Sequence, residues 1–219
     1  MKKPPFIVLE GGEGSGKSTI MRTLKEEYGD NICLTREPGG SPYAELIRDA
    51  AIKNPLAKDA PPETTLCLMF AARYDNVTNT VIPALKNNIP VVSDRFDGSS
   101  YAYQVSSQSG ILEDLFWILR ARLVVQPDVY IFIDVDPREG LKRAQGRNAS
   151  LLKGAEYDHF DNREVFFHEN VRKGYKQFLQ KVKEKAQTNS VIIDGNRPLE
   201  AVKRDVMNVI KKHIDMSTM

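Results

Sequence analysis

The most regular feature of the sequence is a set of five short apolar runs, most of which do not alternate with polar residues. The runs cover residues 6–10, 32–35, 90–93, 129–134 and 191–194. Each is rich in β-branched or aromatic side chains, and a strand that is apolar on both faces is typical of a parallel sheet covered by helices on its two sides. The pattern therefore predicts five buried strands.

The segments between these runs carry helical patterns. Apolar residues recur at every fourth position from 20 to 28 and stop at Gly29, a residue that favours a helix end. Asp136 followed by Pro137 predicts the start of another helix, and Pro198 predicts the start of the last one, because proline suits the first helical turn. Strands that alternate with helices predict an α/β fold in which about five parallel strands are flanked by helices. We expect one domain over residues 1–219.

The composition excludes several classes of protein. Of 219 residues, 41% are hydrophobic, and 31 Lys and Arg against 29 Asp and Glu leave a formal net charge of +2. That balance argues against a protein that wraps a nucleic acid. No apolar run approaches the roughly 18 residues of a membrane span, and residues 6–9 are too short for a signal-peptide core. Two cysteines make no disulfide framework. We therefore expect a cytoplasmic protein that binds neither membrane nor nucleic acid.

A phosphate-binding motif follows the first apolar run. It consists of Gly11, Gly12, Glu13, Gly14, Ser15, Gly16, Lys17, Ser18 and Thr19, and it fits the pattern G-x-x-x-x-G-K-[ST]. The backbone amides of such a loop can cradle phosphates, Lys17 can reach the β and γ oxygens of ATP, and the Ser18 hydroxyl can ligate Mg²⁺. A strand before the motif and a helix after it are the context that this mechanism requires. A glycine-rich turn that binds nothing is the alternative.

The chain lacks the motifs of two other classes of P-loop protein. Neither the guanine-reading string N-K-x-D nor the switch string D-x-x-G occurs, which argues against a regulatory GTPase. None of the five runs ends in Asp-Glu, as the strands of ATP-driven machines usually do. The third run is followed instead by Asp94 and Arg95. The carboxylate can hold the hydration shell of Mg²⁺ near Ser18 and the guanidinium can clamp a second phosphate, which favours an ATP-dependent kinase over a surface ion pair.

Three segments of the chain resemble the thymidylate kinase family in order and spacing. They are residues 12–18, 35–40 and 94–104, and weaker likeness continues at 134–137, 140–144, 167–175 and 198–200. The resemblance implies a P-loop kinase fold that transfers the γ-phosphoryl group of ATP to dTMP with the help of Mg²⁺. It also implies a homodimer and a mobile lid, which we expect at about residues 143–163.

The resemblance also implies an acceptor site. The residues expected to bind dTMP are Glu13, Arg36, Glu37, Arg48, Phe70, Arg73, Arg95, Ser100, Tyr103 and Gln104. Glu13 is expected to reach toward the sugar, Arg73 and Gln104 to hydrogen-bond the pyrimidine edge, and Tyr103 to crowd out a 2′-hydroxyl. Arg95 is expected to reach the acceptor phosphate or base together with either Arg36 or Arg48. Because the second pKa of a phosphate is near 6, its oxygen needs no general base, and catalysis becomes positioning and charge stabilisation.

The helix that carries Arg73 departs from the family's pattern. Thymidylate kinases usually show Phe-x-x-x-Arg, in which the ring stacks on thymine. Here Phe70 lies three residues before Arg73, and Met69 occupies the position four residues before it. Both spacings share one face of a helix, so either side chain can face the base.

The lid departs from the pattern as well. His159-Phe160-Asp161 stands where bacterial relatives commonly carry an arginine two residues before an acidic one, and Glu13-Gly14 lacks the arginine that some eukaryotic members have in the P-loop. The transferring phosphoryl group still needs a cation, so we expect the lid to supply it from Arg147 or Arg143 rather than from Arg163. The expected catalytic residues are thus Lys17, Asp94, Arg95, Arg143 and Arg147, with Ser18 and Asp94 at the metal.

Two other functions stay open. One is a different P-loop nucleoside monophosphate or deoxynucleoside kinase, and the other is a non-catalytic nucleotide-binding module. Five of the acceptor residues also have a purely structural interpretation. Arg48 and Arg73 can be solvated charges on helices, Gln104 can lie on a helix surface, and Phe70 and Tyr103 can pack in the core. The intact Lys17, Ser18, Asp94 and Arg95 favour a kinase.

Overall fold

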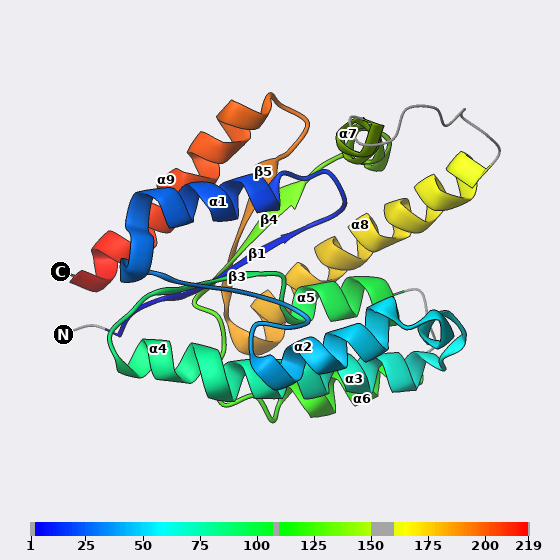
Figure 1. The fold of residues 1–219 in the computed structure, drawn as a ribbon, viewed down its shortest axis with the longest axis horizontal. Coiled ribbons are helices and arrows are strands. Elements are labelled where there is room, and N and C mark those ends of the chain that lie inside the picture. Colours follow the sequence, from blue (N-terminus) through cyan, green and yellow to red (C-terminus); the bar gives the residue numbers. More distant parts are fainter. Residues whose placement is uncertain (1–2, 107–109, 150–159, 219) are drawn as a thin grey trace.

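The computed structural model describes residues 3–106, 110–149 and 160–218. They form a five-stranded parallel sheet with helices on both sides (Figure 1). The strands are β1 (Phe6–Gly11), β2 (Cys33–Arg36), β3 (Val91–Asp94), β4 (Val129–Asp134) and β5 (Asn189–Asp194), and their order in space is β2-β3-β1-β4-β5. Every strand overlaps one of the five apolar runs, so the predicted α/β fold is confirmed.

The three predicted helix boundaries, at Gly29, Asp136-Pro137 and Pro198, each lie next to a helix end in the structure. The helices are α1 (Lys17–Tyr28), α2 (Pro42–Arg48), α3 (Pro62–Asn76), α4 (Ile82–Lys86), α5 (Asp97–Ser100), α6 (Gly110–Arg120), α7 (Pro137–Ala149), α8 (Phe160–Ala186) and α9 (Leu199–Thr218), with π-helical turns at Asp49–Lys53, Val77–Val81 and Tyr101–Val105 and 3₁₀ turns at Gly29–Asn31 and Pro55–Asp59. Gly29 ends α1 with a positive φ of 56°. Asp136 caps α7, because its carboxylate accepts the Arg138 N–H at 2.9 Å. Within the described residues, no helix has both the length and the apolar character that crossing a membrane requires.

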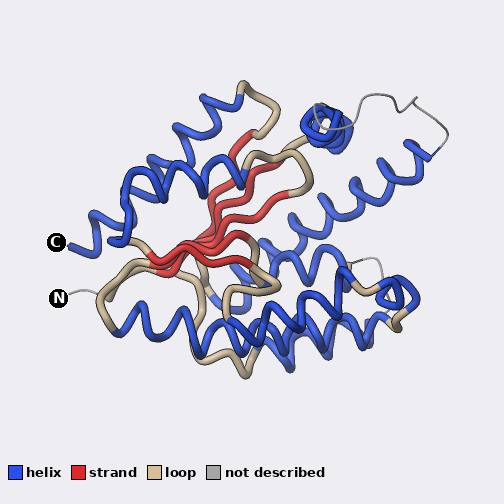
Figure 2. The backbone as a smooth tube through the Cα atoms, in the orientation of Figure 1, coloured by secondary structure: helices blue, strands red, loops and turns tan. Residues whose placement is uncertain are grey.

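The central strands β1, β3 and β4 are buried on both faces, which is why they are continuously apolar, whereas the edge strands β2 and β5 are only partly buried and Ile192 of β5 is exposed. Alternate residues of β1 point to opposite sides of the sheet. Ile7 and Leu9 pack with α1 and α9, whereas Phe6 and Val8 join a larger, aromatic cluster that includes residues of α3, α6 and α8. Figure 2 shows the sheet enclosed between these two helical layers.

The order of the strands creates a crevice at their carboxyl ends. After β1 the chain runs to β2 on one side of the sheet, and after β3 it crosses to β4 on the other side. Ligands bind in open α/β sheets outside the carboxyl ends of the strands at such a reversal point. Gly11 of β1 and Asp94 of β3 are the last residues of their strands, and the register pairs Leu9 with Asp94. The motif at 11–19 and the Asp94–Arg95 pair therefore meet at one edge of the sheet.

Candidate active site

The loop between β1 and α1 has the geometry of a phosphate cradle. Gly14 and Gly16 have φ angles of 64° and 92°, which side chains other than glycine rarely adopt. A Cβ at Gly14 would also lie 2.0 Å from the carbonyl oxygen of Gly140 in α7. Ser15 Oγ donates to the Gly12 carbonyl oxygen at 2.8 Å and holds the turn closed. The backbone path of the loop thus requires both glycines, and the close approach of α7 requires Gly14 as well.

Lys17 brings a buried ammonium group to this loop. Its Nζ donates to the Gly11 and Gly12 carbonyl oxygens at 2.8 and 3.3 Å and lies 3.1 Å from Ser15 Oγ. Burial, together with repulsion from Arg95, lowers the pKa of Lys17 to about 8. No carboxylate within the described part of the chain is bonded to this ammonium group, and a cation so placed at a helix N-terminus is suited to pairing with an anion.

Asp94 ends β3, and Arg95 follows it on a strained and well-anchored backbone. Arg95 has a positive φ of 72°, and it is fixed there because its N–H donates to the Leu9 carbonyl at 2.9 Å and its own carbonyl accepts from Ser93 Oγ at 2.7 Å. The Arg95 guanidinium donates to the hydroxyls of Ser99 and Tyr175. Asp94 Oδ1 is buried without a hydrogen-bond partner among the described residues, so it has an oxygen available for a ligand.

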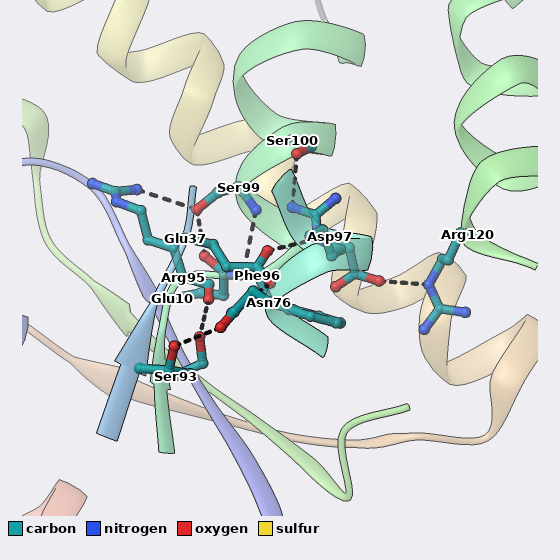
Figure 3. A network of polar contacts seen from close by, with 12 residues as sticks. Glu10, Glu37, Asn76, Ser93, Arg95, Phe96, Asp97, Ser99, Ser100 and Arg120 are labelled. Carbon is teal, nitrogen blue, oxygen red and sulfur yellow. Dashed lines mark hydrogen bonds and ion pairs between the residues drawn. The ribbon is translucent and has the colours of Figure 1, made fainter. Parts of the chain in front are cut away.

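Glu10 is a site residue that the sequence reasoning missed. It is fully buried at the end of β1, and it accepts the N–H groups of Phe96 and Ser99 at 3.0 and 3.1 Å and the Ser99 hydroxyl at 2.7 Å (Figure 3). Burial raises the pKa of Glu10, against these hydrogen bonds. The carboxylate therefore ties β1 to the turn that carries Arg95. The signal that could have found it was an acidic residue at the end of an otherwise apolar strand.

A cavity of about 630 Å³ opens beside the loop and the end of β3. Eight of the ten residues expected at the acceptor site line it, and these are Glu13, Glu37, Arg48, Arg73, Arg95, Ser100, Tyr103 and Gln104. They come from the P-loop, the segment after β2, α2, α3, and the α5 region. A volume in this range is typical of a small-molecule site.

Arg73 is a buried residue of the cavity lining. Its Nε donates to Glu37 Oε2 at 2.6 Å and its Nη2 to Ser100 Oγ at 2.9 Å, and its side chain is 2% exposed. Burial raises the pKa of Glu37 to about 7, against the pull of Arg73. The remaining Nη1 of Arg73 is buried and has no partner among the described residues. Arg73 is therefore buried rather than solvated, and its Nη1 group remains available to donate to a ligand.

Two of the expected acceptor residues do not line the cavity. Phe70 is 1% exposed and packs edge-on against Phe116 at 5.5 Å between centroids, so its ring belongs to the core beneath Arg73. Met69 lines the cavity instead, because consecutive residues of a helix point about 100° apart. Arg36 is exposed, with an ion pair of 2.8 Å to Glu45 that holds it outside the cavity.

The remaining acceptor residues take intermediate positions. Arg48 lines the cavity and donates from Nη1 to the Pro38 carbonyl oxygen at 2.6 Å. Tyr103 is half-buried, and its ring packs against the core while the Arg95 guanidinium lies 5.4 Å from the ring centroid. Gln104, also half-buried, lines the cavity beside it.

The expected lid arginines are only partly described. Arg143 donates to the Gly195 and Asn196 carbonyl oxygens at 2.7 and 3.3 Å and pairs with Glu139 at 2.9 Å. It therefore joins α7 to the segment after β5. His159 and the side chains of Arg147 and Arg163 lie outside the described residues.

A second buried network was not foreseen from the sequence. Asp97, at the start of α5, accepts from Arg120 Nε and from the Tyr130 hydroxyl, each at 2.7 Å. The Asp97 side chain is 0% exposed and that of Arg120 is 7% exposed. The network anchors α5 to α6 and β4 behind the cavity. No local sequence signal links these three residues, which come from distant parts of the chain.

The comparisons with known proteins agree with one another. A family model described as "Thymidylate kinase" matches residues 9–206. A thymidylate kinase from Vibrio parahaemolyticus is 36% identical over 218 residues, which cover 97% of this chain and 98% of that protein. One from Buchnera aphidicola subsp. Baizongia pistaciae is 36% identical over 93% of this chain and 92% of its own length. The crystal structure of thymidylate kinase from Ehrlichia chaffeensis superposes with a TM-score of 0.69 at 28% identity and covers 95% of this chain and 99% of that one.

Proposed function

Because the chain belongs to the thymidylate kinase family and phosphorylates dTMP in nucleotide biosynthesis, we propose that dTMP binds in the 630 Å³ cavity while ATP places its phosphates on the loop of residues 11–19. One observation carries the proposal. Glu13 of the phosphate loop lines the same cavity as Arg73 and Gln104. An acceptor held there has its phosphate next to the donor loop and its base in the interior.

The base end of the cavity supports recognition of thymine. The unused Arg73 Nη1 is a donor that suits the O4 oxygen of the base, and Gln104 offers both a donor and an acceptor. Met69 lines the cavity at the position where the family's pattern has a phenylalanine. Its thioether side chain can pack flexibly against a planar base. Tyr103 also lines the cavity and would crowd a ribose 2′-hydroxyl.

The phosphate end supports catalysis by positioning and charge. Arg95 and Arg48 both line the cavity, whereas Arg36 is engaged by Glu45, so we assign the acceptor phosphate to Arg95 and Arg48. Lys17 would pair with the β and γ oxygens of ATP, and the acceptor phosphate attacks without a general base. The fixed guanidinium and ammonium groups stabilise the charge of the transferring phosphoryl group.

The residues at the end of β3 fit a bound Mg²⁺. This cation prefers oxygen ligands and keeps several waters, and the buried, unpartnered Asp94 Oδ1 and the Ser18 hydroxyl provide such oxygens. When bound, Mg²⁺ would neutralise negative charge on the ATP phosphates. Asp94 would orient its hydration shell and Ser18 would contact it directly.

Five further features of the enzyme are proposed from the sequence and the resemblance. Arg147 supplies the lid cation, and the lid spans about residues 143–163 of a single domain covering 1–219. The protein acts in the cytoplasm. It forms a homodimer, for which the exposed Tyr43 and Leu46 on α2 and Ile111 and Ile118 on α6 offer apolar surface. Size-exclusion chromatography with light scattering measures that assembly.

A panel of acceptors tests the proposed function. ATP-dependent ADP formation is measured with dTMP, dUMP, UMP, CMP, dCMP and dGMP at equal concentration. We expect dTMP to be the best acceptor, dUMP to exceed UMP, and dGMP to be essentially inert. Lys17→Ala should lower turnover about 10²–10⁴-fold with dTMP. A preference for dGMP or CMP contradicts the acceptor assignment and favours another monophosphate kinase, and no transfer to any acceptor favours a binding module.

A further inference from the structure

Tyr175 on α8 is a buried residue that reaches the active site from far along the chain. It lies 80 positions after Arg95, and its hydroxyl accepts a hydrogen bond from Arg95 Nη1 at 2.8 Å. Its ring is 1% exposed and stacks near Phe132 at 5.1 Å and edge-on to Tyr103 at 6.2 Å. The ring fixes the hydroxyl in space independently of the Arg95 side chain.

The Tyr175 hydroxyl also touches both halves of the site. It lies 2.9 Å from Ser99 Oγ, which in turn donates to Glu10. It lies 3.5 Å from the Gly11 carbonyl oxygen, which is the same atom that accepts from Lys17 Nζ at 2.8 Å. One oxygen atom thus lies between the arginine of the acceptor side and the first residue of the phosphate loop.

Arg95 differs from the other arginines that line the cavity in the kind of partner that its guanidinium has. Of the other two arginines that line the cavity, Arg73 is held by the Glu37 carboxylate, and Arg48 donates to the Pro38 carbonyl oxygen. The described hydrogen-bond partners of the Arg95 guanidinium are two neutral hydroxyls, those of Ser99 and Tyr175. Neutral acceptors orient a guanidinium without neutralising it, so its charge remains available for an anion in the cavity.

We propose that the Tyr175 hydroxyl is a positioning group that holds the Arg95 guanidinium in register with the phosphate loop, so that both reach the phosphates of the reaction together. The proposal rests on the assignment of Arg95 to the acceptor phosphate. A freely rotating arginine loses side-chain entropy when it binds an anion. The hydrogen bond to the Tyr175 hydroxyl already restricts the Arg95 side chain, so less entropy is lost on binding. The positive φ of Arg95 and its anchored backbone already fix the base of the side chain, and Tyr175 fixes its far end.

The test is Tyr175→Phe, which deletes one oxygen atom and keeps the ring. We expect kcat/KM for dTMP to fall about tenfold or more, the range of one hydrogen bond to a charged group, while KM for ATP stays within about twofold. Tyr130→Phe is the matched control. Tyr130 is equally buried and its hydroxyl binds Asp97 instead, so it should keep kcat/KM for dTMP within about twofold of wild type even where its thermal midpoint falls.

A double-mutant cycle separates positioning from a loss of fold. In an Arg95→Met background, Tyr175→Phe should cause almost no further loss, because the group that the hydroxyl positions is gone. The proposal is overturned by equal losses in both backgrounds, by wild-type kinetics of Tyr175→Phe, or by a loss confined to KM for ATP. If the acceptor panel shows a different best acceptor, the same cycle on that acceptor still tests Tyr175, so the two failures are distinguishable.

Discussion

Lys17 should take up a proton when ATP binds. In the described site its ammonium group contacts carbonyl oxygens and a hydroxyl, and burial with the nearby Arg95 lowers its pKa to about 8. The phosphates of ATP bring negative charge to this position, and an opposite charge within about 4–6 Å favours the protonated form by about 1–3 pKa units. Because the folded, nucleotide-free pKa is depressed and the bound pKa is restored, proton uptake grows as the pH rises through 8.

The size of the effect follows from that pKa. At pH 9, about 90% of Lys17 is neutral before binding, and at pH 7 about 10% is neutral. Binding should therefore take up about 0.9 proton at pH 9 and about 0.1 at pH 7. The dissociation constant of ATP should rise about tenfold over the same interval, since each neutral lysine must first be protonated.

Titration calorimetry with Mg²⁺ and ATP, and without an acceptor, measures this uptake in two buffers of different ionisation enthalpy. Lys17→Met is the control, and we expect it to bind more weakly and to take up no proton at pH 9. At that pH the carboxyl of Glu37, with a pKa of about 7, is already ionised and contributes little. Uptake near zero in the wild type, or an undiminished uptake in Lys17→Met, would refute the reasoning.

Three further perturbations test other parts of the account. Arg147→Ala should lower kcat about 10²-fold with little change in KM for dTMP, and Arg143→Ala should be milder because Arg143 is bound to backbone carbonyls; stopped-flow turnover of both variants decides the order. Asp97→Ala should cost about 3–5 kcal/mol by leaving the buried Arg120 unpaired, and a midpoint in a denaturant titration unchanged from wild type contradicts this. Met69→Phe should lower the dissociation constant of dTMP about two- to tenfold through ring stacking, measured by calorimetry, and weaker binding would count against the assignment of Met69 to the base.

The fold and the phosphate loop could be predicted because their signals are local. A buried parallel strand is a short apolar run, and a phosphate cradle needs glycines at fixed spacing before a helix. The α1 boundary at Gly29 and the cap at Asp136 were likewise predictable from single residues whose conformational or hydrogen-bonding preferences decide the outcome.

The rest of the site depends on contacts between distant residues, which no local pattern encodes. Spacing alone did not show whether Phe70 or Met69 faces the cavity. In the structure the Phe70 ring packs against Phe116 of α6 and therefore lies in the core. Arg36 matched the family motif, yet Glu45 nine residues later holds it outside the cavity. The role of Glu10 could not be predicted from its acidic character alone, because the partners that it joins lie 86 and 89 positions away.

The central claim is that the buried Nη1 group of Arg73 recognises thymine in the cavity by donating a hydrogen bond to the base. The most direct measurement is the ratio of kcat/KM for dTMP to that for 5-methyl-dCMP. The two differ at position 4, where an oxygen acceptor becomes an amino donor, and in the proton of the neighbouring ring nitrogen. A buried Nη1 that faces an amino group loses its partner, so we predict a ratio of about 10² or more in favour of dTMP. A ratio near one, or a preference for 5-methyl-dCMP, would contradict the placement of the base against Arg73.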